Sequence, residues 1–118
     1  MNKVAIIVLA DTETHGDLGR AFNALQAVKE FKEAGDDVRL IFDGAGTKWI
    51  VEFSNPDHKA HDLFEAVKDK IAGACYYCSK AFGVKAGVEN CGIPFTSESE
   101  GHPSFRKLIQ EGFQIITF

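Results

Sequence analysis

A chain of 118 residues with 45% hydrophobic content and ten phenylalanines is long enough for a single domain over residues 1–118, and a second domain is not expected. The formal net charge of −4, with both signs scattered along the chain, offers no basic patch for a nucleic-acid backbone. The first apolar segment, residues 4–10, is too short to span a membrane and lacks the context of a signal peptide. We therefore expect a cytoplasmic protein that binds neither nucleic acid nor membrane.

The first part of the chain predicts a strand, a helix and a second, parallel strand. Residues 4–10 are continuously apolar, which is typical of a strand buried on both faces of a parallel sheet. After a polar loop over 11–16, apolar residues recur at helical spacing from Asp17 until Gly35 ends the run. A second strand is expected over 38–42, which brings the chain back to the sheet.

The middle of the chain predicts two helices and a third strand. Thr47 is expected to cap a short helix that ends at Phe53. A longer helix is expected over 60–71, because its apolar residues form one stripe. Residues 71–77 are mostly apolar and predict a short buried strand, and residues 79–85 predict a helix after it. The third strand and its helix thus repeat the order of the first.

The last third predicts a loop, a helix and a closing strand. Residues 87–99 contain Gly, Asn, Pro and Ser without periodicity and predict a surface loop that includes Cys91. Pro103 suits the first turn of a helix, and Gly112 suits the position after its end. The residues expected on the inner side of this helix are Phe105, Leu108 and Ile109. A final strand is expected over 113–118.

Alternating strands and helices in a short chain predict an α/β fold, a three-layer α/β/α sandwich with a mostly parallel sheet of four or five strands, flavodoxin-like or Rossmann-like. In such sheets, ligands bind beyond the carboxyl ends of the strands. The loops over 11–16 and 43–47 and the segment around Cys78 are therefore expected at one edge.

Cys75 and Cys78 have the C-x-x-C spacing of a dithiol redox pair or of half a zinc site. Cys78 falls where a strand is expected to give way to a helix, and the positive helix end there favours a thiolate. This makes Cys78 the candidate nucleophile. In a strand the two side chains would point to opposite faces, and only a helical turn starting near Tyr77 would bring the sulfurs together.

Two further interpretations remain open for these cysteines. Cys75 also fits a small buried hydrophobic residue. A zinc site would combine both cysteines with Cys91 and His102, but the first pair lies in an apolar segment rather than a knuckle turn, and the expected core needs no metal to fold. We therefore predict no metal and no other cofactor.

A glycine-containing turn follows the second strand. The N–H groups of Gly44, Gly46 and Thr47 would form a nest for a small anion, next to Asp43, although a simple tight turn explains the same residues. The full nucleotide-binding motifs are missing, so no nucleotide is implied. His15, in the loop after the first strand, is a candidate proton acceptor beside Cys78 or else a solvated histidine.

Several segments together resemble one known family. They are the apolar first strand with its Arg20-containing helix, Phe42-Asp-Gly-Ala-Gly-Thr-Lys-Trp49, Ala74-Cys-Tyr-Tyr-Cys-Ser-Lys-Ala-Phe-Gly-Val84, Glu100-Gly-His-Pro-Ser-Phe105 and Gln114-Ile-Ile-Thr-Phe118. Nearly the whole chain resembles the DsrE/DsrF-like family of small α/β sulfur-relay proteins. The resemblance implies that Cys78 carries a persulfide and that the protein works as a homo- or hetero-oligomer. We expect a homo-oligomer, whether dimer, trimer or hexamer. Cys75 is an addition that sulfur-relay subunits need not have.

The leading hypothesis is thus a sulfur carrier, a possible sulfurtransferase or persulfide relay subunit that exchanges sulfur with donor and acceptor protein thiols through Cys78, with Cys75 able to resolve the persulfide as a disulfide. Two alternatives stay open. One is a non-catalytic module that binds a small anion or serves in assembly. The other is a dithiol redox switch between Cys75 and Cys78.

Overall fold

Five parallel strands form the centre of the protein, in the order β4-β3-β2-β1-β5. The computed structural model describes residues 1–118. The strands are β1 (Lys3–Val8), β2 (Asp37–Phe42), β3 (Ile71–Cys75), β4 (Phe95–Thr96) and β5 (Gln114–Thr117). The predicted parallel sheet is confirmed, and every connection between neighbouring strands is a crossover through at least one helical segment.

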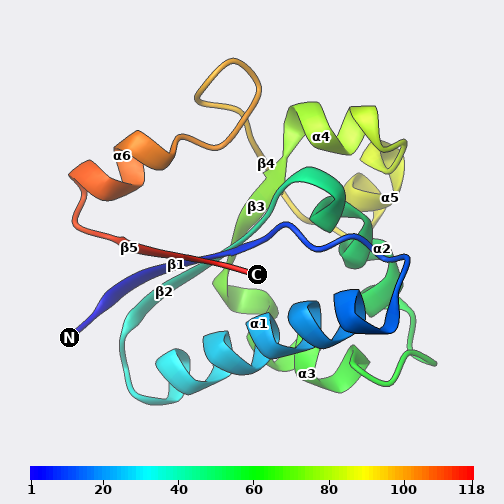
Figure 1. Cartoon of the computed structure of the whole chain (residues 1–118), viewed down its shortest axis with the longest axis horizontal. Helices are drawn as coiled ribbons and strands as arrows, with labels where there is room; N and C mark the ends of the chain where they lie inside the picture. Colours follow the sequence, from blue (N-terminus) through cyan, green and yellow to red (C-terminus); the bar gives the residue numbers. More distant parts are fainter.

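Helices cover both faces of this sheet, which confirms the three-layer α/β/α sandwich. In Figure 1, α1 and α3 lie on one side of the sheet and α6 on the other, with α4 and α5 toward one end. The helices are α1 (His15–Glu33), α2 (Trp49–Ser54), α3 (His61–Val67), α4 (Tyr76–Ala81), α5 (Lys85–Asn90) and α6 (Phe105–Gln110). Two 3-10 turns, η1 (Gly44–Lys48) and η2 (Lys68–Lys70), complete the fold.

The two faces of the sheet bury very different amounts of apolar surface. Side chains alternate along β1, so Val4, Ile6 and Val8 join a core of 19 buried residues beneath α1 and α3. Ala5 and Ile7 point the other way, into a cluster of five buried residues under α6. The larger core therefore supplies most of the hydrophobic stabilisation.

Helix α1 begins two residues earlier than the apolar pattern predicts. Thr14 is its N-cap: the Thr14 hydroxyl accepts a hydrogen bond from the Asp17 N–H, and the Asp17 carboxylate accepts one from the Thr14 N–H. This capping box satisfies two N–H groups that would otherwise lack partners, so it fixes the start of the helix at His15.

The predicted boundaries around the cysteines are wrong by a few residues. Strand β3 ends at Cys75 instead of Tyr77, and α4 covers Tyr76–Ala81 instead of 79–85. The Tyr77 N–H donates to the Gly101 carbonyl at 2.9 Å, and the Cys78 N–H donates to the Cys75 sulfur. These two hydrogen bonds take the backbone out of the sheet directly after Cys75.

The surface loop predicted over 87–99 is also wrong, because this segment contains most of α5 and all of β4. Val88 is fully buried and packs α5 against the large core. A Cβ on Gly87 would lie 2.6 Å from the Val51 side chain, so this glycine permits close packing against α2 rather than marking a turn. Sequence composition alone does not separate these two uses of glycine.

The position of the last helix is predicted correctly, but only part of its predicted inner side is buried. Gly112 follows the end of α6 with a φ of +91°, as predicted, and the strand after it forms as β5. Leu108 is buried as expected, whereas Phe105 and Ile109 are 37% and 63% exposed. Pro103 lies before the N-cap Ser104 rather than in the first turn. The predicted helix over 60–71 is shorter, since α3 gives way to η2.

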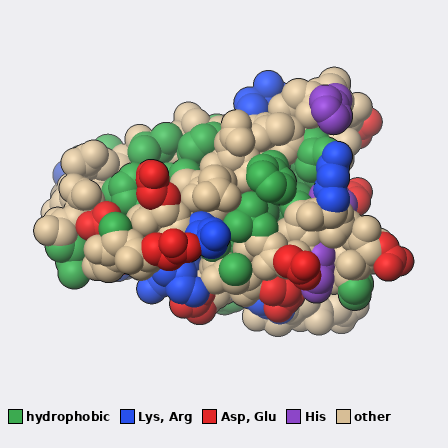
Figure 2. Space-filling model, turned by 90° about the horizontal axis from the view of Figure 1, so that it is seen from below, with side chains coloured by type: hydrophobic (Ala, Val, Ile, Leu, Met, Phe, Trp, Pro, Cys, Tyr) green, Lys and Arg blue, Asp and Glu red, His purple; other side chains and the backbone are tan.

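The molecular surface offers no single dominant charge on the face that Figure 2 shows. Acidic, basic and hydrophobic side chains are interspersed over the side of the sheet that α1 and α3 cover. None of the helices combines the length and the apolar character that crossing a bilayer requires.

Candidate functional site

Four side chains meet beyond the carboxyl ends of β2 and β3. They are Asp43 after β2, Cys75 at the end of β3, Cys78 in α4, and His102 in the loop between β4 and α6. One oxygen, two sulfurs and one ring nitrogen all lie within 4.8 Å of one another. Because the strands are parallel, their carboxyl ends deliver residues far apart in sequence to the same edge.

Cys75 is the buried member of the group. Its side chain is 0% exposed, and its Sγ lies 3.3 Å from His102 Nδ1 and 3.7 Å from the Gly101 carbonyl oxygen. As the N-cap of α4, the same sulfur accepts the Cys78 N–H at 3.4 Å. Burial raises the pKa of the Cys75 thiol to about 12, and the negative charge of Asp43 acts in the same direction. Cys75 is therefore a neutral thiol at neutral pH.

Cys78 is the cysteine of the pair that solvent reaches. It is half-buried, and its thiol donates to Asp43 Oδ1 at 3.6 Å. The helical turn starting at Tyr76 brings the two sulfurs together, which is the condition that the C-x-x-C spacing needed. The Cys78 N–H already has the Cys75 sulfur as its acceptor.

His102 completes the group on a tightly turned loop. Ser99 and His102 exchange two backbone hydrogen bonds of 2.9 Å, and between them Glu100 and Gly101 have positive φ values of 52° and 89°. A non-glycine residue with positive φ carries strain, so the rest of the loop must hold Glu100 in place. The Tyr77 ring lies against the imidazole with centroids 4.8 Å apart.

The turn that carries Asp43 uses its N–H groups internally. The Gly44 N–H donates to Asp43 Oδ1 at 2.8 Å, and the Gly46 N–H donates to the Asp43 carbonyl. Thr47 is fully buried and its hydroxyl donates to the Gly44 carbonyl, so it does not cap α2 as predicted. The geometry is that of a 3-10 turn that fixes the Asp43 carboxylate.

The other sequence candidates lie outside the four-residue group. His15 is exposed at the start of α1, and His102 is the histidine that contacts a cysteine. Cys91 lies at the end of α5 against the large core. The loop after β1 does reach the same edge, because Lys48 in η1 forms an ion pair with Asp11 at 2.6 Å.

The sequence predicts Cys75, Cys78 and Asp43 near one edge of the sheet, but it indicates a role for His102 only in a zinc set. The available signal was the Glu100–Phe105 segment, which holds His102 next to a proline and a glycine. Periodicity could not find it, because the contact depends on a loop 26 residues beyond Cys75 folding back over α4.

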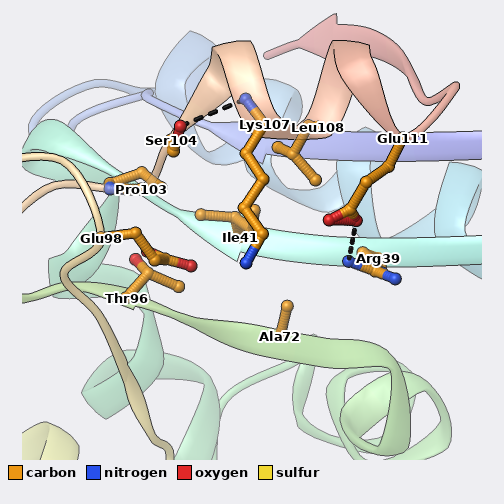
Figure 3. A pocket seen from close by; sticks show the side chains of 10 residues that line it. All are labelled: Arg39, Ile41, Ala72, Thr96, Glu98, Pro103, Ser104, Lys107, Leu108 and Glu111. Atoms are coloured by element: carbon orange, nitrogen blue, oxygen red, sulfur yellow. Dashed lines mark hydrogen bonds and ion pairs between the residues drawn. The ribbon is translucent and has the colours of Figure 1, made fainter.

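Two cavities are lined in part by the loop between β4 and α6. A cavity of about 390 Å³ adjoins the cysteine segment and is lined by Tyr76, Tyr77, Lys80, Ala81, Glu100 and Gly101. A second cavity of about 240 Å³ lies between α6 and the strands, where Lys107 extends toward the sheet and Arg39 pairs with Glu111 at 3.8 Å (Figure 3). The cysteines line neither cavity, but the cavity beside α4 is lined by Tyr76 and Tyr77, which lie between them in the sequence.

Comparison with known proteins identifies the family of this chain. The chain is 30% identical over 94 residues to the uncharacterised protein MJ0733 of Methanocaldococcus jannaschii, covering 80% of this chain and 76% of that protein. A protein of unknown function, BT1422 from Bacteroides thetaiotaomicron, superposes with a TM-score of 0.61. That match covers 97% of this chain and 94% of the other at 18% identity, so it shows the fold alone. The DsrE/DsrF-like family matches residues 2–118, and the chain belongs to this family.

Proposed function

We propose that this protein carries sulfane sulfur as a persulfide on Cys78. Family membership and the close Cys75–Cys78 pair fit a sulfur-relay or redox role. The observation that favours Cys78 is its exposure: it is half-buried, whereas Cys75 is completely buried. A thiol must be both reachable and able to ionise to attack a sulfur donor, and Cys75 fails on both grounds.

The proposed loading step is an exchange between two thiols. The Cys78 thiolate attacks the outer sulfur of a donor persulfide, and a sulfur–sulfur bond forms at Cys78 Sγ. The bond between the two donor sulfurs breaks, and the donor leaves as a thiolate that takes up a proton. No net oxidation occurs. Unloading is the same exchange with an acceptor thiol, so protein thiols serve as both donor and acceptor.

The neighbouring groups define how Cys78 is presented. Its S–H donates to the Asp43 carboxylate, which gives the thiol one orientation. The hollow lined by Tyr77, Lys80 and Glu100 lies beside α4 and offers both signs of charge to an approaching partner. In this proposal, Asp43 is a positioning residue and Cys78 is the catalytic residue.

Mass spectrometry of the intact, reduced protein after incubation with a small-molecule persulfide tests the proposal. We expect an adduct of about 32 Da, the mass of one sulfur atom, in the wild type and in Cys91→Ser. The adduct should disappear in Cys78→Ser. Sulfur loading that persists unchanged in Cys78→Ser would contradict the proposal, as would loading that depends on Cys91.

The proximity of the two sulfurs favours a second candidate function, a dithiol switch. In this case an external disulfide would oxidise Cys75 and Cys78 to a disulfide and would itself be reduced to two thiols, with two electrons and two protons transferred. Equilibration of Cys91→Ser with oxidised and reduced glutathione would then give a reversible loss of two thiols. A protein that remains fully reduced until it unfolds would rule this candidate out.

A further inference from the structure

We propose that the reduced protein binds one zinc ion through Asp43, Cys75, Cys78 and His102. This inference goes beyond sulfur transfer, because it requires no sulfur donor and no persulfide. It rests on the positions of four side chains that the fold brings to one point.

The chemistry of the four groups suits zinc. Two cysteine sulfurs, which release their protons when the metal binds, one imidazole nitrogen and one carboxylate oxygen are the ligand types that Zn²⁺ takes in tetrahedral sites. The sulfurs disfavour Mg²⁺ and Ca²⁺, which prefer oxygen ligands alone. Four protein ligands also leave no open position, so the site resembles a structural or regulatory site more than a catalytic one.

The spacing of the ligand atoms is close to that of a tetrahedral site. Bonds of about 2.0–2.3 Å place neighbouring ligand atoms about 3.3–3.8 Å apart around zinc. Cys75 Sγ lies 3.3 Å from His102 Nδ1, and Cys78 Sγ lies 3.6 Å from Asp43 Oδ1. Since no pair exceeds 4.8 Å, the widest pair needs to close by only about 1 Å.

Contacts around the four groups already orient them. The Gly44 N–H holds the Asp43 carboxylate, the Cys78 N–H holds the Cys75 sulfur, and the Tyr77 ring packs on His102. Such outer contacts fix the direction of metal ligands and strengthen binding. The ligands also come from the end of a strand, one helical turn and two tight turns, so little ordering is needed when the metal enters.

The position of Asp43 changes the zinc set that the sequence allowed. The zinc set considered from the sequence, where no metal was predicted, included Cys91; Cys91 packs against the large core, and Asp43 takes its place. Cys91→Ser is therefore a matched control, since it removes one cysteine and leaves the proposed site intact. One consequence is that zinc and a persulfide compete for the Cys78 sulfur.

The test uses the whole reduced chain under anaerobic conditions, titrated with Zn²⁺ against a chromophoric chelator. We expect one zinc per chain in the wild type and in Cys91→Ser. In Asp43→Asn and His102→Ala the affinity should fall by more than the roughly 10–100-fold that loss of an outer contact costs. Asn still caps the turn, so Asp43→Asn keeps the local fold, and circular dichroism checks both variants. Co²⁺ in the wild type should show the absorption of a tetrahedral, thiolate-bound ion.

Three results would overturn the zinc site: no stoichiometric binding by the wild type, unchanged affinity in both Asp43→Asn and His102→Ala, or loss of binding in Cys91→Ser. The sulfur-loading experiment is independent of these titrations. A protein that binds zinc but accepts no sulfur keeps the zinc site and loses the sulfur-carrier function, and the opposite pair of results does the reverse.

Discussion

Burial separates two cysteines that the sequence presents as one motif. Cys75 is fully buried, and the pKa of its thiol is raised. Cys78, one helical turn later, is half-buried beside the Asp43 carboxylate. The C-x-x-C spacing indicates that the sulfurs can meet, but it does not say which one meets solvent. That difference follows from where β3 ends, and it decides which thiol is available for chemistry.

The burial of Cys75 predicts a large difference in thiol modification. With iodoacetamide, Cys78 should react in the native protein. Cys75 should react at least roughly 10³-fold more slowly than Cys78, because exposing Cys75 requires a local opening that costs several kcal/mol. Peptide mapping by mass spectrometry with and without guanidinium measures both rates. Equal native rates for Cys75 and Cys78 would show that the site is open in solution.

Long elements with strong patterns were predictable from the sequence, and short elements near the site were not. The first strand, the first helix and the second strand have enough apolar residues to show their period. Helix α4 and β4 contain only six and two residues, and distant partners define both. The hydrogen bond from Tyr77 to Gly101 is one such tertiary contact that no local pattern reports.

The turn that carries Asp43 depends on a glycine at one position. A Cβ on Gly46 would lie 2.0 Å from the Val8 carbonyl oxygen, a backbone atom that cannot move aside. We expect Gly46→Ala to lower the free energy of unfolding by about 3 kcal/mol or more, because overpacking displaces the turn. Denaturant unfolding followed by the fluorescence of Trp49, the single tryptophan, measures this change.

Gly19→Ala provides the matched control for that substitution. Gly19 lies on the exposed side of α1 with nothing within 4 Å of its Cβ position. Alanine there should stabilise the protein by roughly 0.5–1 kcal/mol through helix propensity. If Gly46→Ala behaved like Gly19→Ala, the close approach of η1 to β1 would be refuted.

An ion pair between α1 and η2 predicts a dependence of stability on acid pH. Lys32 donates to Asp69 at 2.8 Å, and this hydrogen bond lowers the pKa of the Asp69 carboxyl below 3.8. The folded state therefore binds the proton less tightly than the unfolded state, and the stabilisation is present above about pH 4 and lost as the pH falls through the lowered value. Both side chains are partly exposed, so the contribution is below about 1 kcal/mol.

Unfolding of Asp69→Asn at pH 7 and near pH 2 tests this contribution. We expect the variant to be less stable than the wild type at pH 7, with a difference that shrinks as the pH falls below about 4 and the Asp69 carboxyl of the folded wild type takes up its proton. Asp57→Asn, which removes an exposed carboxylate without an ion pair, should show no such change. A difference between wild type and Asp69→Asn that is the same at both pH values would contradict the ion-pair account.

At the scale of the whole molecule, the two layers around the sheet are unequal. The buried cluster that the strands form with α1, α2, α3 and α5 has nineteen residues, whereas the cluster under α6 has five, and Ile109 of α6 remains 63% exposed. Because local opening is easiest where few apolar contacts hold an element, amides of α6 should exchange hydrogen faster than those of α1 in a monomer. Hydrogen exchange with mass spectrometry compares the two helices directly.

Comparing hydrogen exchange in α6 and α1 also tests whether α6 lies in the interface of the expected homo-oligomer. Light scattering gives the number of chains in solution, and Ile109→Glu should reduce that number if the exposed part of α6 lies in the interface. Slow exchange in α6 together with a multimeric mass supports self-association through this layer. Fast exchange in α6 together with a multimeric mass places the interface elsewhere, and a monomeric mass contradicts the oligomer.

Locating the added sulfur on the chain tests most directly whether Cys78 is the sulfur carrier. The wild-type protein is loaded with a small-molecule persulfide, blocked with an alkylating reagent, digested and sequenced by tandem mass spectrometry. We predict that fragment ions place the extra sulfur, about 32 Da, on Cys78, with Cys75 and Cys91 unmodified by sulfur. Placement of that sulfur on Cys75 or Cys91 would show that Cys78 is not the carrier.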